Sequence, residues 1–194
     1  MGGANPVRPL SPAVHAEPSA SPSDRLRHDW RFPWPDPPLR IVLVEPEIPP
    51  NTGNIARLCA ATGTRLHLVE PLGFQLTSAA MKRAGLDYWD HVQLERHPDW
   101  PGFLESVRPP RLHLFTTAAA RSVFDADFRP GDSLVFGSES RGLPEALLAA
   151  YPDCTVGIPQ QTHAVRSLNL ANSVAIALYE ALRQIQRANG AASS

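Results

Sequence analysis

Cysteine and lysine are scarce in this sequence. Among 194 residues there are two cysteines, Cys59 and Cys154, and one lysine, Lys82. The cysteines stand far apart in apolar surroundings, so we expect two buried free thiols, which suits a reducing cytoplasm. Because lysine is nearly absent, any phosphate-binding cluster would consist of arginines, whose planar guanidinium binds phosphate as a fork.

Long apolar runs and a strong excess of either charge are also missing. No run approaches the roughly 20 residues that a membrane-spanning helix needs, and the N-terminus lacks the apolar stretch of a secretory signal. The formal net charge is −1, so no overall field would draw the protein onto nucleic acid. We therefore expect a cytoplasmic protein with no membrane partner, in which any phosphate binding is local.

The remaining composition fits one ordinary globular domain. With 43% hydrophobic and 19% charged residues in a chain of 194, one domain with a substantial core is expected and two are not. Residues 1–38 are rich in proline, serine and alanine and show no periodicity, which predicts a disordered extension. The domain itself is expected to span residues 39–190.

Strands and helices are expected to alternate from Arg40 onward. Apolar runs predict strands at residues 40–45, 65–70, 92–95, 111–117, 132–139 and 154–159. Helices are expected at residues 53–62, 77–85, 99–107, 143–151 and 168–187. Near-continuous apolar strands separated by helices are typical of a parallel sheet flanked by helices on both faces, so the predicted fold class is α/β.

Three strand ends carry unusual residues, and in parallel α/β sheets ligands collect at the carboxyl ends of the strands. The first stretch, "PPNTGNIARLCAATG", has Asn51 or Thr52 to cap a helix start that could face an anion, and Arg57 on the polar side of that helix. The second, "LVFGSESRGLPEALL", places Gly137 and Glu139 between a strand and a helix. In the third, "GIPQQTHAVRSLNLANSVA", Ser167 is a reasonable N-cap for the last helix.

Each stretch taken singly also has a plain structural explanation. They could be a capped helix with an exposed arginine, a glycine-rich turn with a surface ion pair, and a capped helix after a solvated loop. Their convergence at strand ends favours one composite site.

Several other kinds of site lack support. Leu143 and Pro144 stand where a Walker phosphate loop needs Lys and Ser or Thr, and neither G-x-G-x-x-G nor G-x-S-x-G occurs. The histidines show no metal-ligand spacing, so no metal is expected. His67 and His113 alternate with apolar residues and are expected to face solvent or a helix.

Taken together, the stretches resemble a known family. "EPEIPPNTGNIARLCAATG", "LVFGSESRGLP" and "IP…RSLNLANSVAIALYEALRQ" resemble the three motifs of the SPOUT-class RNA 2′-O-methyltransferases. "EPLGF" and "RAGLDYW" are similar to the subfamily that methylates the wobble nucleotide of tRNA, cytidine or a modified uridine. The resemblance covers residues 40–186, and the combined motifs are highly specific.

The resemblance implies a fold, a cofactor and a substrate. It implies a parallel α/β domain with a C-terminal deep trefoil knot, S-adenosylmethionine (SAM) as methyl donor, and the tRNA anticodon stem-loop as partner. It also implies an obligate homodimer with the active site between subunits. Residue by residue, it places SAM contacts at Phe115, Thr116, Gly137, Ile158, Ser167 and Leu168. The catalytic arginine falls on Arg57, and the other motif positions fall on Asn51, Glu139 and Asn169.

The predicted chemistry is methyl transfer to a ribose 2′-oxygen. A guanidinium with a pKa above roughly 12 is a poor base, so we expect Arg57 to bind the adjacent phosphate and stabilise the developing alkoxide. The candidates for a local phosphate track are Lys82, Arg83, Arg121, Arg141 and Arg166. Ordinary surface ion pairs are the alternative for these residues.

Two alternatives to this function stay open. One is 2′-O-methylation of ribosomal RNA or of another tRNA position, and the other is an idle module that binds SAM or RNA. The loop "QQTHAVRSLN" is one residue longer than the usual subfamily loop, with Ala164 and Val165 in place of polar residues. The SAM contacts within residues 160–166 are therefore not assigned.

Overall fold

The computed structural model describes residues 32–76, 88–161 and 164–191, and every structural statement refers to these residues. Most of the predicted extension 1–38, and the whole of the predicted helix 77–85, lie outside them. None of the helices within these ranges combines the length and the apolar character needed to cross a bilayer.

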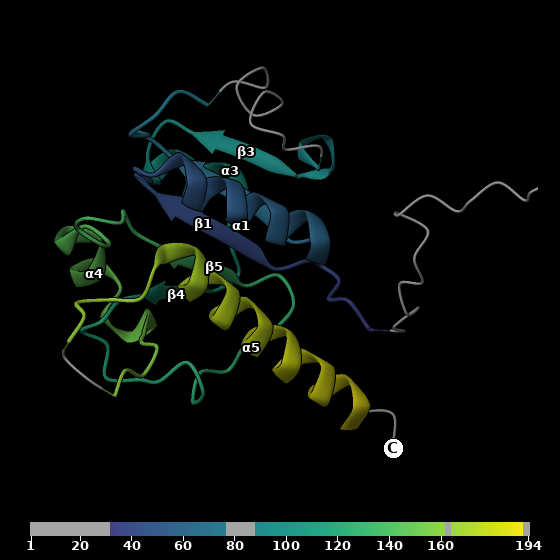
Figure 1. Cartoon of the computed structure of the whole chain (residues 1–194). Coiled ribbons are helices and arrows are strands. Elements are labelled where there is room, and N and C mark those ends of the chain that lie inside the picture. Colours follow the sequence, from purple (N-terminus) through teal and green to yellow (C-terminus); the bar gives the residue numbers. More distant parts are fainter. Residues whose placement is uncertain (1–31, 77–87, 162–163, 192–194) are drawn as a thin grey trace, which may run out of the picture. The chain divides into compact units, whose positions relative to one another are not determined.

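One parallel sheet organises the described chain (Figure 1). Its strands are β1 (Arg40–Val44), β2 (Arg65–Val69), β3 (Leu94–His97), β4 (Leu112–Phe115), β5 (Ser133–Phe136) and β6 (Thr155–Val156). They lie in the order β3-β2-β1-β5-β4-β6, and every pairing is parallel. The predicted α/β class is confirmed, although β3 begins two residues later than the run at 92–95. The order reverses between β1 and β5, which is where ligands collect in such sheets.

Helices cover both faces of the sheet. Successive side chains of a strand point to opposite faces, so Ile41 and Leu43 of β1 face one side while Val42 and Val44 face the other. The first side is covered by α1 (Pro49–Thr62) and α5 (Leu170–Ala191), and the second by α3 (Trp100–Val107) and α4 (Glu145–Ala150). Figure 1 shows α1 and α5 on the same face of the sheet. Two short 3₁₀ turns, η2 (Trp89–His91) and η3 (Pro152–Cys154), complete the elements of the described ranges.

The first helix begins earlier than predicted. α1 starts at Pro49, four residues before the expected start, and its N-cap is Ile48, which makes no side-chain cap bond. The prediction that Asn51 or Thr52 caps this helix was therefore wrong. The two prolines begin the helix because their φ is already helical and their missing N–H falls among donors that have no intrahelical acceptor.

The last helix is capped by a different residue from the one predicted. Asn169 Oδ1 accepts hydrogen bonds from the backbone N–H groups of Ala171 (2.9 Å) and Asn172 (3.3 Å). Asn169, rather than Ser167, thus satisfies the free donors at the start of α5. Val174, Leu178 and Leu182 form the buried face of this helix and are almost fully buried.

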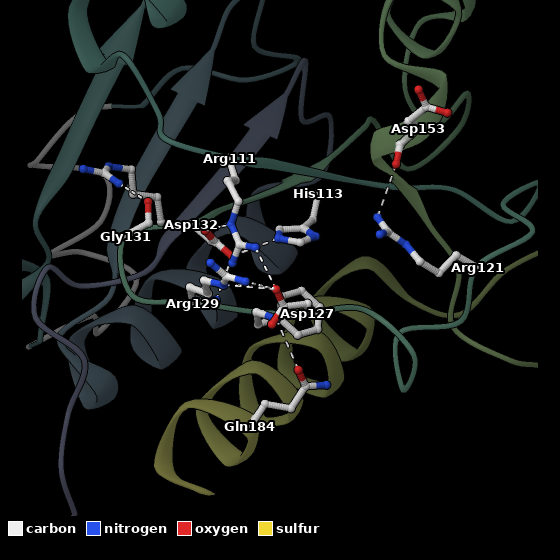
Figure 2. Close-up of polar contacts among 11 residues, drawn as sticks. Arg111, His113, Arg121, Asp127, Arg129, Gly131, Asp132, Asp153 and Gln184 are labelled. Atoms are coloured by element: carbon white, nitrogen blue, oxygen red, sulfur yellow. Dashed lines mark hydrogen bonds and ion pairs between the residues drawn. The ribbon is translucent and has the colours of Figure 1, made fainter. Parts of the chain in front are cut away.

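A buried carboxylate holds the amino ends of β4 and β5 together (Figure 2). Asp132 accepts two hydrogen bonds from the Arg111 guanidinium, at 2.9 and 2.7 Å, and one from the backbone N–H of Arg129 at 2.9 Å. His113 Nε2 lies 2.9 Å from the same carboxylate. Burial alone would raise the pKa of Asp132, but the hydrogen bonds from His113, Arg111 and the Arg129 backbone outweigh it and lower the pKa. This charged cluster lies at the sheet edge opposite the strand ends that carry the motifs.

Both cysteines are free, as expected, but Cys154 is only half-buried, so the expectation of two buried thiols holds for Cys59 alone. Cys59 of α1 is buried, and burial raises the pKa of its thiol to about 12. A thiol with that pKa stays protonated at neutral pH, so Cys59 is a packing residue and not a nucleophile.

Candidate active site

A cavity of about 580 Å³ opens at the carboxyl ends of β4, β5 and β6. Its size is in the range of small-molecule sites. All six residues predicted to contact SAM line it, namely Phe115, Thr116, Gly137, Ile158, Ser167 and Leu168. Three of the four predicted catalytic residues, Asn51, Glu139 and Asn169, line it as well. The structure therefore brings nine of the ten predicted site residues to one place.

The loop after β5 shapes one wall of this cavity through a close backbone approach. Ser138 and Gly142 exchange backbone hydrogen bonds of 3.2 and 2.8 Å, which folds the loop back on itself. A Cβ on Gly137 would stand 1.9 Å from the carbonyl carbon of Gly142, so no other residue fits there. Gly142 adopts φ 73°, a left-handed conformation that favours glycine. Glu139, Ser140 and Arg141 are thereby presented at the tip of the loop.

The anion at the start of α1 is supplied by the chain itself. Glu139 accepts hydrogen bonds from the backbone N–H groups of Glu47 (2.8 Å) and Ile48 (3.2 Å), and from the side-chain amide of Asn51 (3.0 Å). A carboxylate at a helix N-terminus is favoured by the free N–H donors and by the helix dipole. The helix start expected to face an outside anion is therefore occupied by Glu139.

Asn169 extends this network to the third motif. Its side-chain amide donates a hydrogen bond of 3.0 Å to Asn51 Oδ1, while its own oxygen caps α5. Asn169, Asn51 and Glu139 thus connect the starts of α1 and α5 with the loop after β5. In the single chain the three side chains hold the walls of the cavity together, and their predicted catalytic roles stay predictions.

Arg57 is the one predicted site residue that the single chain does not bring to the cavity. It lies six residues beyond Asn51 on α1, which is about 9 Å along a helix axis. Its side chain is exposed, and its guanidinium carbon lies 4.8 Å from the centroid of the Tyr88 ring. Among the described residues, the Arg57 guanidinium has no hydrogen bond and no ion pair.

Acidic residues beside the cavity were missed by the sequence reasoning. Arg141 donates a hydrogen bond of 3.1 Å to Glu45 and lies 3.9 Å from a Glu47 oxygen. Ser140 Oγ also donates to Glu47, at 2.8 Å. The acidic pair in "EPEIPPN" was the signal that could have identified these partners. Because Arg141 is paired with carboxylates, it is a weaker phosphate ligand than a free arginine would be.

Two other arginines of the predicted phosphate track lie together. Arg121 and Arg166 line a second cavity of about 430 Å³. Arg166 also lines the first cavity, as do Thr117, Ile158 and Gln160. Arg121 donates a long hydrogen bond of 3.4 Å to the carbonyl of Asp153 (Figure 2). Lys82 and Arg83 lie outside the described residues.

Tertiary structure brings together a histidine pair that spacing along the chain did not reveal. His67 of β2, His97 of β3 and His113 are all buried. His67 packs against Phe103 of α3, so of its two expected environments, solvent or a helix, the helix is the one observed. Together with Glu95, His67 and His97 place three possible metal ligands within 4.8 Å of one another. His67 Nδ1 and His97 Nε2 are 3.0 Å apart, the distance of a hydrogen bond that uses both nitrogens. We keep the prediction that no metal binds.

This chain is similar in sequence to known RNA methyltransferases. Residues 38–179 match the family described as the SpoU rRNA Methylase family. A curated relative from Polaromonas sp. (strain JS666), named tRNA (cytidine(34)-2'-O)-methyltransferase, is 54% identical over 159 residues, which cover 80% of this chain and 94% of the relative.

Two solved structures are similar to this chain as well. One, described as structural insights into the 2-OH methylation of C/U34 on tRNA, is 52% identical with a TM-score of 0.70, over 75% of this chain and 95% of that one. The other is the SpoU methyltransferase AviRb from Streptomyces viridochromogenes in complex with AdoMet. It is 27% identical with a TM-score of 0.65, over 75% of this chain and 59% of that one.

Proposed function

This chain belongs to the SpoU rRNA Methylase family, and from that premise we propose that it methylates the wobble nucleotide of tRNA. The methyl group of SAM goes to the ribose 2′-hydroxyl of nucleotide 34, a cytidine or a modified uridine. One observation carries this proposal: six residues matched to SAM contacts, drawn from three separate stretches, line a single cavity. The name of the Polaromonas relative supports tRNA rather than ribosomal RNA as the substrate.

The cavity fits SAM in size and in the chemistry of its walls. Phe115, Ile158 and Leu168 supply apolar surface, while Thr116, Ser167 and the backbone of Gly137 supply polar groups. Such a mixture suits a ligand that has an aromatic base and a charged amino acid. When bound, SAM supplies a methyl group on a positively charged sulfur. We propose that the trefoil knot of the family is formed by the segments that carry these residues.

Arg57 is the proposed catalytic residue. The ribose 2′-oxygen forms a bond to the methyl carbon while the carbon–sulfur bond breaks, and the hydroxyl proton leaves to the neighbouring phosphate or to water. Arg57 binds that phosphate through its planar fork and stabilises the negative charge that develops on the oxygen. A guanidinium is well suited to this role because it stays charged at the reaction pH.

The single chain is incomplete for this chemistry, and a homodimer completes it. Arg57 is absent from the lining of its own cavity, so we propose that it enters the site built on the partner's cavity. Two large apolar side chains on α5 are exposed, Ile176 at 38% and Tyr179 at 55%. Exposed apolar groups on one helix face are typical of a subunit interface, and α5 packs beside α1, which carries Arg57.

Mapping the methylated nucleotide tests the proposed function. Purified protein is incubated with labelled SAM and either unmodified tRNA or ribosomal RNA, and each product is digested and sequenced for 2′-O-methylation. We expect label at nucleotide 34, and tRNA binding that weakens steeply with salt because the contacts are to phosphates. Label at another tRNA position or in ribosomal RNA would support the first alternative, and no transfer at all would support an idle binding module.

Two substitutions test the role of Arg57. Arg57→Lys keeps the charge and loses the fork, so we expect kcat to fall by at least about tenfold while the Kd for SAM is unchanged. A near-normal kcat in this variant would remove Arg57 from the mechanism. Thr117→Trp changes the cavity and leaves Arg57 intact. Thr117 is an exposed residue of the cavity wall, and we expect the larger tryptophan side chain to block SAM binding.

Mixing two inactive variants tests whether Arg57 acts across the dimer. Arg57→Ala has an intact cavity and Thr117→Trp has an intact arginine. If Arg57 acts on the partner's cavity, random mixed dimers contain one complete site each and restore about a quarter of the wild-type activity. If Arg57 acts within its own subunit, the mixture stays inactive.

A further inference from the structure

Among the residues that the structure describes, the guanidinium of Arg57 rests on an aromatic ring and not on a carboxylate. Its carbon lies 4.8 Å from the centroid of the Tyr88 ring, inside the roughly 6 Å within which a cation is attracted to a ring face. This contact is notable for an arginine proposed to act in catalysis. A carboxylate partner would take up the planar fork and cancel its charge, whereas a ring holds the guanidinium and leaves its N–H donors available for phosphate.

Tyr88 is itself fixed to the helix that carries Arg57. Its hydroxyl donates a hydrogen bond of 2.9 Å to the carbonyl of Gly53. In a regular α-helix that carbonyl also accepts the backbone N–H of the residue four positions on, which is Arg57. The phenol is therefore attached one helical turn before the arginine whose side chain it supports.

The chain around Tyr88 is also held in place. The Tyr88 carbonyl accepts the backbone N–H of His91 at 3.0 Å, which closes the turn η2. Tyr88 and Trp89 pack against the core cluster that contains Ile55 and Cys59 of α1. The ring thus has a defined position relative to α1, and a long, exposed arginine side chain gains a preferred direction from it.

We infer that Tyr88 is a positioning residue for methyl transfer: it holds the Arg57 guanidinium by its face, so that the fork is already directed at the incoming phosphate. This inference rests on the proposed function, because it assigns Tyr88 a role through Arg57. It predicts that removing the ring lowers the turnover rate even though Tyr88 does not touch SAM.

Three substitutions test the inference by activity. Tyr88→Leu removes the ring, Tyr88→Phe keeps the ring and loses the bond to Gly53, and Tyr151→Leu is the matched control in the cluster on the opposite face of the sheet. We expect Tyr88→Leu to lower kcat roughly tenfold, with an unchanged Kd for SAM and an unchanged circular dichroism spectrum. Tyr88→Phe is expected to retain most of the activity, and Tyr151→Leu to retain the wild-type kcat.

A double-mutant cycle identifies the route of the effect. Single-turnover rates are measured for Tyr88→Leu in the wild-type background and in Arg57→Ala. If Tyr88 acts through Arg57, its substitution costs nothing further once Arg57 is gone. The same fold loss in both backgrounds, or no loss in the wild-type background, would overturn the inference. Full activity of Arg57→Ala alone would overturn the role of Arg57 and, with it, the inference.

A spectroscopic measurement tests the contact without any reaction. The Nε–H signal of Arg57 in a ¹H–¹⁵N spectrum should show a ring-current shift in the wild type and in Tyr88→Phe, and should lose it in Tyr88→Leu. An identical signal in all three proteins would contradict the contact. A retained shift in a protein that fails to methylate tRNA would leave the contact in place and count against the proposed function alone.

Discussion

The carboxylate of Glu139 takes the place of a side-chain cap at the start of α1. It lies 92 positions beyond Glu47 in the chain, yet it accepts hydrogen bonds from the N–H groups of Glu47 and Ile48 and from Asn51. The side chain of Asn51 therefore does not cap α1. Its amide nitrogen donates to Glu139, and its oxygen accepts a hydrogen bond from Asn169. At the residue scale, one carboxylate connects the first two motifs, and Asn51 connects them to the third through Asn169.

Glu139→Gln should therefore destabilise the protein. The amide nitrogen of glutamine would face N–H donors that now meet a carboxylate oxygen, so we expect the free energy of unfolding to fall by about 2 kcal/mol. Urea unfolding at fixed protein concentration measures the change. Glu105→Gln, at an exposed position of α3, is the matched control. Its free energy of unfolding is expected to stay within about 0.5 kcal/mol of the wild-type value. Equal stability of the two variants would show that the network contributes nothing.

At the scale of elements, the short edge strand β3 depends on its contact with β2. His67 lies opposite Glu95 in the parallel register, and His97 follows two residues later on the same face. Both imidazoles pack against Phe103 of α3, with ring centroids 5.6 and 5.3 Å away. Ser106 Oγ lies 3.2 Å from His97 Nδ1, which fixes the orientation of that ring. A hydrogen-bonded pair in an apolar layer thus connects two strands and a helix.

Acid should weaken this contact. Burial lowers the pKa of His67 to about 3, with the neighbouring His97 as a second cause, and burial also lowers the pKa of His97. Between the ordinary pKa of about 6.5 and these lower values, the unfolded chain binds protons that the folded chain does not, so stability falls as the pH drops below about 6.5. We expect a loss of about 2 kcal/mol from His67 between pH 7.5 and pH 5.

Chemical unfolding at the two pH values measures this loss. The double variant His67→Leu, His97→Leu should lose less stability than the wild type over the same interval, while the exposed His91→Gln should behave like the wild type. The same preparations test the prediction of no metal. A rise in the unfolding midpoint with zinc that disappears in the double variant would contradict it.

For the whole molecule, the decisive feature is that Arg57 does not line the cavity proposed to bind SAM in the same chain. A symmetric dimer would resolve this, because a two-fold axis presents the same face of each subunit to the other. Among the large apolar side chains exposed on the described surface, Ile176 and Tyr179 lie together on α5. Phe124, which is 61% exposed, lies elsewhere in the loop after β4.

Tyr179→Arg should separate the subunits without unfolding them. A charged group in an apolar interface is costly, and we expect the dimer Kd to rise by more than about tenfold. Analytical ultracentrifugation measures the association, and methylation should fall together with the dimer fraction. Phe124→Arg is the matched control, expected to leave both unchanged. A Tyr179→Arg protein that stays dimeric and active would place the interface on another surface.

Local patterns in the sequence determined the alternation of strands and helices and the stretches that line the cavity. These follow from periodicity and from motif residues that lie close together in the chain, since neighbours in sequence share one strand end or helix face. Only the tertiary structure decided that Glu139 binds the start of α1, that His67 meets His97, and that Arg57 lies on Tyr88. Each of those contacts joins segments about 30 to 90 residues apart and depends on how the elements pack against one another, which no local spacing can express.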